Sequence, residues 1–252
     1  MLLVRESSPR PPALEVALSH ALVERVGAGA LGPTLRIYRP APTLAFGRLD
    51  ALRAGFPAAA AAARAHGFEP VVRAPGGHGV AYHDGCLVVD EIFPHTNPIA
   101  GLQQRFRRSA ETLAEALRGL GVDSRVGRIA GEFCPGEHTV SARSAVKLVG
   151  SAQRVIRHAS LLAASIAVTD AAGLRAVLED VYDALELEWD PATAGGVADE
   201  VGAVSVDDVE RAVVDAYGRR GELVPGEIDA TTLTRARELE PRHAVAALEL
   251  RH

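Results

Sequence analysis

The stretch "SARSAVKLVGSAQR", residues 141–154, contains the one lysine of the chain. Lysine and arginine together number 27 among 252 residues, so the other 26 cations are arginines. Lys147 opens an apolar run that leads into Gly-Ser-Ala, a pattern that favours a strand over a solvated helix face. An ammonium is a compact charge whose pKa can fall on burial, whereas a guanidinium is wide, planar and always charged. The pattern favours a site where arginine would fail. The alternative is a surface lysine retained by chance.

Apolar periodicity on both sides of this stretch predicts helices and clusters of short strands. Helices are expected over 12–29, 101–121, 171–185, 206–220 and 230–239, and in an alanine-rich stretch that is interrupted at Pro57 and ends at Gly67. Strands are expected over 34–40, 43–48, 69–73, 79–84, 86–93, 124–128, 138–142, 146–156 and 161–168.

The strands come in clusters without a helix between each pair. We therefore expect an α/β (α+β) fold, with a mixed, mainly antiparallel sheet flanked by helices around one core. The whole chain, residues 1–252, is expected to be a single domain. Within it, residues 191–252 are expected to form a helical C-terminal extension.

Composition limits the function classes. The formal net charge is −5 and no basic stripe is present, so nucleic acid is not expected as a partner. No apolar run approaches the roughly 20 residues of a membrane span, and the N-terminal stretch lacks the pattern of a signal peptide. Two cysteines do not make a disulfide framework and suit a reducing compartment. A cytoplasmic protein without membrane association is expected.

The segment "GEFCPGEHTV", residues 131–140, places Cys134 in a polar loop with a Pro-Gly turn. A cysteine of structural role more often lies in an apolar strand, as Cys86 does in "GCLVVD". Cys134 is therefore a candidate nucleophile, because an exposed loop favours the reactive thiolate. The alternatives are a thiol without a role and a metal ligand paired with His138. One cysteine and one histidine do not complete a zinc site, so no metal is expected.

The segment "VVRAPGGHGVAYHDG", residues 71–85, places a Gly-Gly-His-Gly turn between two expected strands. Glycines permit positive φ and let backbone N–H groups face a ligand. No Gly-Lys-Ser/Thr follows, and the next element is a strand, so neither a P-loop nor a dinucleotide fingerprint is present. The alternative is an ordinary hairpin turn with surface histidines.

Together these elements resemble the lipoate-protein ligase and octanoyltransferase superfamily, whose catalytic domain is shared by biotin-protein ligases. The resemblance spans at least residues 13–168. "TLRIYRPAPTLAFGR" (34–48) looks like the early strand pair of the family. "RAPGGHGVAYHD" (73–84) is similar to its Arg-Arg-x-Ser/Thr-Gly-Gly-Gly-Ala-Val-x-His-Asp loop, and "VKLVGSAQR" (146–154) is similar to its Lys-(Val/Ile)-x-Gly-Ser-Ala-Gln/Phe strand. The fold implied is the biotin/lipoyl ligase-like catalytic domain.

The resemblance implies a role for each matching position. Lys147 matches the essential lysine of the family and would contact the acyl carbonyl or an acyl phosphate. The residues implied to bind substrate are Arg73, Gly76, Gly77, His78, His83, Gly150, Ser151 and Ala152. The chain departs from the family where Ala74 replaces the second arginine, Gly76 replaces Ser/Thr and His78 replaces a glycine. Residues 163–165 read Ala-Ala-Ser where the family has His-Gly-Ser.

Cys134 stands where the cysteine-using octanoyltransferases carry their nucleophile, shortly upstream of the motif lysine. The resemblance thus implies transfer of an octanoyl or lipoyl group through a Cys134 thioester, with Cys134 and Lys147 catalytic and Lys147 helping to keep the thiolate ionised. The donor implied is acyl carrier protein. The acceptor is a lysine of a lipoyl domain, either in a 2-oxoacid dehydrogenase or in glycine cleavage H protein. No cofactor is expected, and His78, His83 and His138 are candidate bases.

Two other functions remain open. The first is an ATP-dependent lipoate-protein ligase that works through an acyl-adenylate and requires ATP with Mg. The chain after Val168 is expected to be too short for the accessory domain that such ligases commonly carry. The second is a non-catalytic protein that binds an acyl group or a lipoyl domain.

Overall fold

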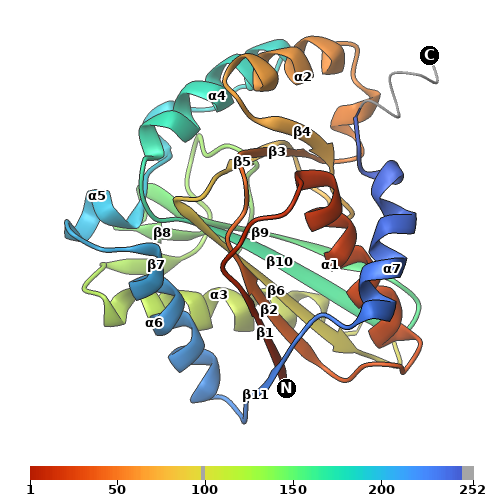
Figure 1. The fold of residues 1–252 in the computed structure, drawn as a ribbon. Helices are drawn as coiled ribbons and strands as arrows, with labels where there is room; N and C mark the ends of the chain where they lie inside the picture. Colours follow the sequence, from red (N-terminus) through yellow and green to blue (C-terminus); the bar gives the residue numbers. More distant parts are fainter. Residues whose placement is uncertain (98–99, 246–252) are drawn as a thin grey trace.

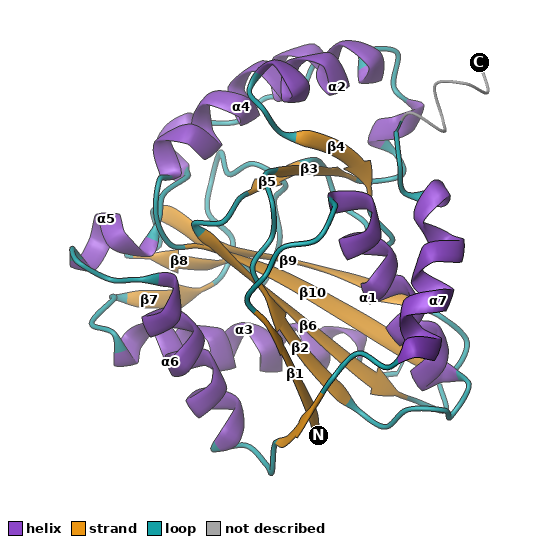
Figure 2. Ribbon diagram, in the orientation of Figure 1, coloured by secondary structure: helices purple, strands orange, loops and turns teal. Residues whose placement is uncertain are grey.

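The computed structural model describes residues 1–97 and 100–245 (Figure 1). A large sheet of eight strands has the order β11-β1-β2-β6-β10-β9-β8-β7, and a small sheet has the order β4-β3-β5 (Figure 2). The strands of the large sheet are β1 Leu2–Glu6, β2 Thr34–Tyr38, β6 Cys86–Pro94, β7 Ser124–Val126, β8 Val140–Ala142, β9 Val146–Val155, β10 Ala159–Ala167 and β11 Val224–Gly226. Those of the small sheet are β3 Thr43–Phe46, β4 Glu69–Val72 and β5 Val80–Tyr82.

The expected mixed, mainly antiparallel arrangement is confirmed. In the large sheet, β1 pairs in parallel with β2 and β11, and the other neighbours are antiparallel. Two features differ from the expectation of a single sheet. The strands β3, β4 and β5 form a sheet of their own, and β1 and β11 were not expected as strands. Both strands are short and pair with partners far away in the sequence, so local hydrophobic periodicity does not predict them.

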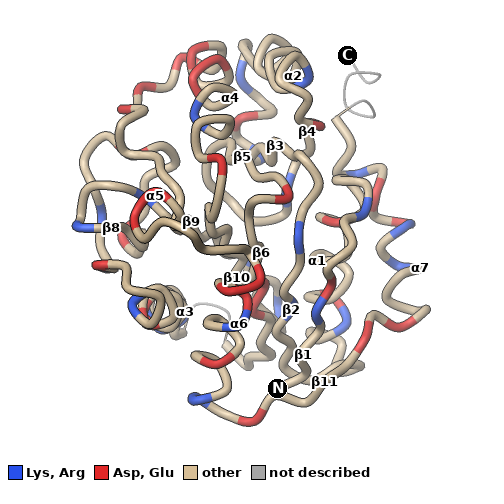
Figure 3. The backbone as a smooth tube through the Cα atoms, turned by 60° about the vertical axis from the view of Figure 1, so that its left-hand side comes forward, with Lys and Arg blue, Asp and Glu red and all other residues tan. Residues whose placement is uncertain are grey.

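The helices cover both sheets. They are α1 Pro12–Gly27, α2 Phe56–Ala65, α3 Leu102–Gly119, α4 Ala171–Ala184, α5 Val197–Val201, α6 Val206–Gly218 and α7 Ala230–Leu239, with short 3-10 helices at Asp50–Leu52, Pro191–Thr193 and Glu240–Arg242. α3 and α6 lie on one face of the large sheet and α1 with α7 on the other, while α2 and α4 pack on the small sheet (Figure 1). Acidic and basic residues both occur along outer helices such as α4 and α7 (Figure 3).

Residues 191–245 are tied to the rest of the fold. β11 extends the large sheet beside β1, α6 packs against α3, and α7 packs against α1. α6 begins with a capping box, in which the Ser205 hydroxyl accepts a hydrogen bond from the Asp208 amide and the Asp208 carboxylate accepts one from the Ser205 amide. The expected helical extension thus also supplies an edge strand. Its last part, residues 246–252, lies outside the described residues.

The register of three central strands creates space on the side of the large sheet that faces α1. On β10, Ala163 lies opposite Asp90 of β6 and Ala152 of β9, and Ser165 lies opposite Gly150. Small side chains at adjacent positions leave room that larger residues would fill. The cavity described below occupies this room.

Within the described ranges 1–97 and 100–245, every helix is too short or too polar to cross a membrane.

Candidate active site

Cys134 lies between two spaces, an inner cavity and an outer groove. The inner cavity is bounded by α1, the small sheet and strands β6, β10 and β9. The outer groove, about 800 Å³, is lined by the glycine turn, the loop after Cys134 and α3. Cys134, Lys147, Ser151 and Ala152 line both spaces. A group bound to the Cys134 sulfur would therefore have access to both.

The backbone of Cys134 adopts a left-handed conformation, with φ +43°. This region is uncommon for residues other than glycine and costs about 1–3 kcal/mol, so surrounding contacts must hold it in place. Such strain concentrates at functional sites, because it presents a side chain that a relaxed loop would turn away. Cys134 is half-buried and free, which agrees with its interpretation as a nucleophile.

The side chain of Lys147 supplies the contacts that hold this loop. It is 3% exposed, and Nζ lies 2.8 Å from the carbonyl oxygen of Phe133, 2.9 Å from that of Cys134 and 2.9 Å from Oε2 of Glu132. Three acceptors engage the three N–H donors of an ammonium. Gly150 accommodates the lysine stem, since a Cβ there would lie 3.1 Å from Lys147 Cε. A guanidinium is too wide for this arrangement, which explains the retained lysine.

Glu132, which the sequence analysis did not identify, organises the same loop from inside. It is buried, and Oε2 accepts a hydrogen bond from the Thr139 hydroxyl at 2.6 Å in addition to its ion pair with Lys147. Oε1 accepts from the backbone amide of Ile129 at 3.2 Å. A buried charge is tolerated when it is paired and hydrogen-bonded in this way. The available sequence clue was an acidic residue two positions before the candidate cysteine.

The Cys134 sulfur contacts the glycine turn. The backbone amide of His78 donates to Sγ at 3.1 Å, and Nη2 of Arg73 lies 4.0 Å from Sγ. Arg73 Nη2 also donates to the carbonyls of Gly76 at 2.8 Å and His78 at 2.9 Å, which shapes the turn. Gly77 has φ +89°, and a Cβ there would lie 2.8 Å from Sγ, so only glycine fits.

The contacts of the sulfur bear on the expectation that Lys147 helps to keep the Cys134 thiolate ionised. Among the described residues, the donors that reach the sulfur are the His78 amide and the Arg73 guanidinium. Lys147 binds the backbone on either side of the sulfur-bearing carbon. Arg73 is therefore the cation in contact with the sulfur, and Lys147 contacts the loop that carries it. The expected role of Lys147 at the thiolate stays a prediction.

The ring of His78 is held by a buried carboxylate. His78 Nδ1 lies 2.8 Å from Oδ1 of Asp50, which is fully buried in the 3-10 helix Asp50–Leu52. Asp50 Oδ2 accepts from the Gly47 amide at 3.2 Å. A carboxylate on Nδ1 leaves Nε2 as the nitrogen that can accept a proton. Asp50 was not identified from the sequence, since nothing near it marks a partner 28 residues away.

The other two candidate bases differ in position. His83 lies in the turn between β5 and β6, where its Nδ1 accepts from the Gly85 amide at 2.8 Å, and it is not among the described residues that line the inner cavity or the outer groove. His78 is likewise absent from the described lining of both spaces, so the expected contact of either histidine with substrate stays a prediction. His138 lines the outer groove, stacks on Phe106 and contacts Gln103 Oε1 at 3.0 Å.

The remaining expected substrate-binding residues are divided between the two spaces. Arg73, Gly150, Ser151 and Ala152 line the inner cavity, while Gly76 and Gly77 line the outer groove. Cys86 is buried in β6, and burial raises the pKa of its thiol to about 12, which agrees with its interpretation as structural. In the part of the chain that the structure describes, no group of three His, Cys, Asp or Glu side chains is arranged to hold a metal.

Two curated relatives with similar sequences have the same name. The octanoyl-[GcvH]:protein N-octanoyltransferase of Geobacillus kaustophilus is 28% identical over 162 residues, which are 64% of this chain and 57% of the relative. The protein of that name from Anoxybacillus flavithermus is 30% identical over 141 residues, 56% of this chain and 50% of the relative. The aligned part of the chain thus spans about half the length of these curated relatives.

Solved structures show the same fold. A lipoate-protein ligase A bound with ATP superimposes with a TM-score of 0.73 at 22% identity, covering 95% of this chain and 93% of the other. The bi-partite lipoate protein ligase from Thermoplasma acidophilum gives a TM-score of 0.68 at 21% identity, with 95% and 92% covered. Residues 11–218 match the family model of the lipoyl protein ligase A/B catalytic domain. The chain therefore belongs to the lipoyl protein ligase A/B catalytic domain family.

Proposed function

We propose that this protein transfers an octanoyl or lipoyl group from one protein carrier to a lysine of a lipoyl domain, through a thioester on Cys134. One observation carries the proposal. The Cys134 sulfur, on a left-handed backbone, lies where the inner cavity meets the outer groove, with an amide donor and a guanidinium beside it. The name shared by the curated relatives supports this reaction class.

In the first half-reaction, the Cys134 thiolate attacks the acyl carbonyl of the donor. The new C–S bond forms as the bond between the acyl group and the carrier breaks, and the leaving atom of the carrier takes up the proton that the Cys134 thiol gave up on ionisation. Arg73 and the His78 amide contact the sulfur and hold it in place for attack. The inner cavity receives the acyl chain.

In the second half-reaction, the acceptor lysine enters through the outer groove and attacks the thioester carbonyl. A C–N bond forms, the C–S bond breaks, and Cys134 is released as thiolate. The attacking amine must lose a proton, so a base is required. His78 fits this role best of the three histidines, since its own amide touches the sulfur and Asp50 orients its ring.

Replacing Asp50 by asparagine is expected to slow transfer from acyl-Cys134 to the acceptor by about 10²-fold or more, because the ring loses its orienting carboxylate. The change is nearly isosteric, and single-turnover transfer from protein loaded with octanoate measures it. His138→Gln is the control, as this histidine lines the outer groove and its ring contacts Gln103 in place of a carboxylate. If His138→Gln slows transfer and Asp50→Asn does not, His138 is the base.

Two candidate proteins for the acyl donor can be compared directly. The sequence resemblance suggests acyl carrier protein, whereas the name of the curated relatives specifies octanoyl-[GcvH]. A lipoyl domain is incubated with this protein and either donor, without ATP, and its intact mass is measured. A gain of one octanoyl group with either donor supports the transferase and identifies the donor. No gain with either, together with a gain from free lipoate and ATP with release of AMP, would establish the ligase instead.

A further inference from the structure

Part of the inner cavity is lined by polar side chains away from Cys134 in the sequence, although an octanoyl chain has no polar group to place beside them. Val16, Val88 and Leu161 supply apolar lining. Beside them, the lining includes four residues with polar side chains, named here the polar floor: Ser19, Tyr38, Tyr82 and Asp90. They come from α1, β2, β5 and β6.

Asp90 has one oxygen without a partner. Its side chain is 1% exposed; Oδ2 accepts from the Ser19 hydroxyl at 2.5 Å and lies 3.6 Å from Nη1 of Arg36. Oδ1 is buried and has no hydrogen-bond partner in the described chain. A buried carboxylate oxygen without a donor costs on the order of 1–3 kcal/mol or more. A ligand that brings a donor to this oxygen would recover that cost.

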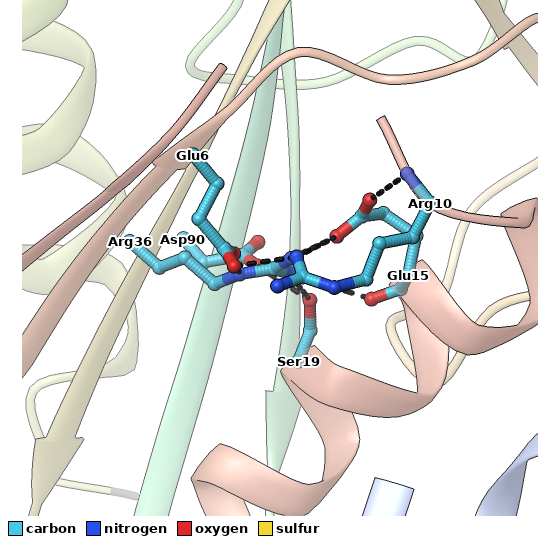
Figure 4. Close-up of polar contacts among 6 residues, drawn as sticks. All are labelled: Glu6, Arg10, Glu15, Ser19, Arg36 and Asp90. Carbon is cyan, nitrogen blue, oxygen red and sulfur yellow. Dashed lines mark hydrogen bonds and ion pairs between the residues drawn. The ribbon is translucent and has the colours of Figure 1, made fainter. Parts of the chain in front are cut away.

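Neutralisation of Arg36 does not require Asp90. The fully buried Arg36 guanidinium pairs with Glu6 at 2.7 Å and closely with Glu15 (Figure 4). It also stacks over the Tyr38 ring. Arg10 joins the same group through Glu6 at 2.5 Å. Two guanidiniums thus face three carboxylates, and Asp90 is the one that lines the cavity. Burial raises the pKa of Asp90 to about 6, so it remains mostly ionised at neutral pH.

The polar floor lies across the large sheet from the strand that carries Lys147 and Gly150, at a separation comparable to the length of a medium-length acyl chain. Gly150, which touches the Lys147 stem, lies opposite Ser165, and Asp90 lies opposite Ala163. Asp90 is therefore two strands across and two residues along from Gly150, which corresponds to about 12 Å. The tyrosines of the floor keep their protons, since burial raises the pKa of Tyr38 and Tyr82.

The geometry points to an acyl substrate that carries a hydrogen-bond donor, of which a hydroxyl is the simplest, near the end remote from its carbonyl. Asp90 Oδ1 accepts from this donor, and Tyr38 and Tyr82 border it. The inference rests on the proposed function, because it assumes that the inner cavity holds the acyl chain of the Cys134 thioester. It adds the requirement for a hydrogen-bond donor near the remote end of the chain, which octanoate lacks.

Binding of the free acids tests the polar floor without any chemistry at Cys134. Calorimetry with octanoic acid and 8-hydroxyoctanoic acid is expected to show wild-type protein binding the hydroxy acid at least about tenfold more tightly, as a hydrogen bond to a charged group provides. Asp90→Val is expected to reverse the preference. Glu6→Gln is the matched control, since it removes a carboxylate of the same cluster that does not line the cavity, and it should keep the preference.

The wild-type comparison decides the matter even if Asp90→Val does not fold. Equal or tighter binding of octanoic acid, binding of neither acid, or an unchanged ratio in folded Asp90→Val overturns the inference. Loading of Cys134 by octanoyl donors, measured by intact mass on the same samples, reports separately on the proposed function. If Cys134 is loaded but the hydroxy acid is not preferred, only the inference about the polar floor fails. If the hydroxy acid is preferred but Cys134 is not loaded, only the proposed transferase function fails.

Discussion

Replacing Cys134 by alanine abolishes acyl transfer, with an expected loss of at least about 10⁴-fold, because the covalent intermediate cannot form. Intact mass measures the step directly. Wild-type protein incubated with an octanoyl donor should gain one octanoyl group that neutral hydroxylamine removes, as it removes thioesters, and the variant should gain none. Binding of the free acid should persist, since alanine leaves the inner cavity open.

Cys86→Ala is the matched control for this experiment. It removes the other cysteine of the chain, which is buried in β6 with its thiol pKa raised to about 12, and it should load and transfer as wild type does. Full transfer by Cys134→Ala would contradict the thioester mechanism. If that activity depended on ATP and released AMP, the family resemblance to ligases would describe the chemistry.

The parts of the fold predicted from the sequence are those with a local pattern. The periodic apolar positions of α3 and its glycine stop identify the helix, and the apolar run after Lys147 identifies β9. β11 was not predicted because its three residues, Val-Pro-Gly, carry no periodicity, and its pairing depends on β1 more than 200 residues away. The separation of β3, β4 and β5 into a second sheet is likewise a long-range outcome.

The same distinction applies to the site. Cys134 and Lys147 stand out by residue type and neighbours, so the sequence alone marks them. Asp50 and Glu132 do not, since a buried carboxylate becomes meaningful only when its partner is known, and acidic residues are common. Asp90 lies in the apolar run "CLVVDEIF", which predicts a strand correctly but does not indicate which face meets a cavity. Its unpartnered oxygen is visible only in the folded chain.

The family resemblance and the structure suggest different roles for Lys147. In the family resemblance its ammonium contacts the acyl carbonyl, whereas in this structure its three N–H groups bind Glu132 and the carbonyls of Phe133 and Cys134. If the ammonium holds the loop, changing it should disturb the Cys134 sulfur even in a reaction that has no acyl oxyanion. Alkylation of Cys134 by iodoacetamide is such a reaction.

We expect Lys147→Arg to lower Cys134 loading by about 10²-fold or more, because the wider guanidinium displaces the loop and with it the sulfur. Alkylation by iodoacetamide should slow as well, since the displaced sulfur loses its contacts with the His78 amide and Arg73. Glu132→Gln keeps both carbonyl contacts of Lys147 and should show a smaller loss in both assays. Thermal unfolding identifies any variant that fails to fold. If Lys147→Arg is alkylated at the normal rate but is no longer loaded, the anchoring role is contradicted. The result would instead support contact between the Lys147 ammonium and the acyl carbonyl.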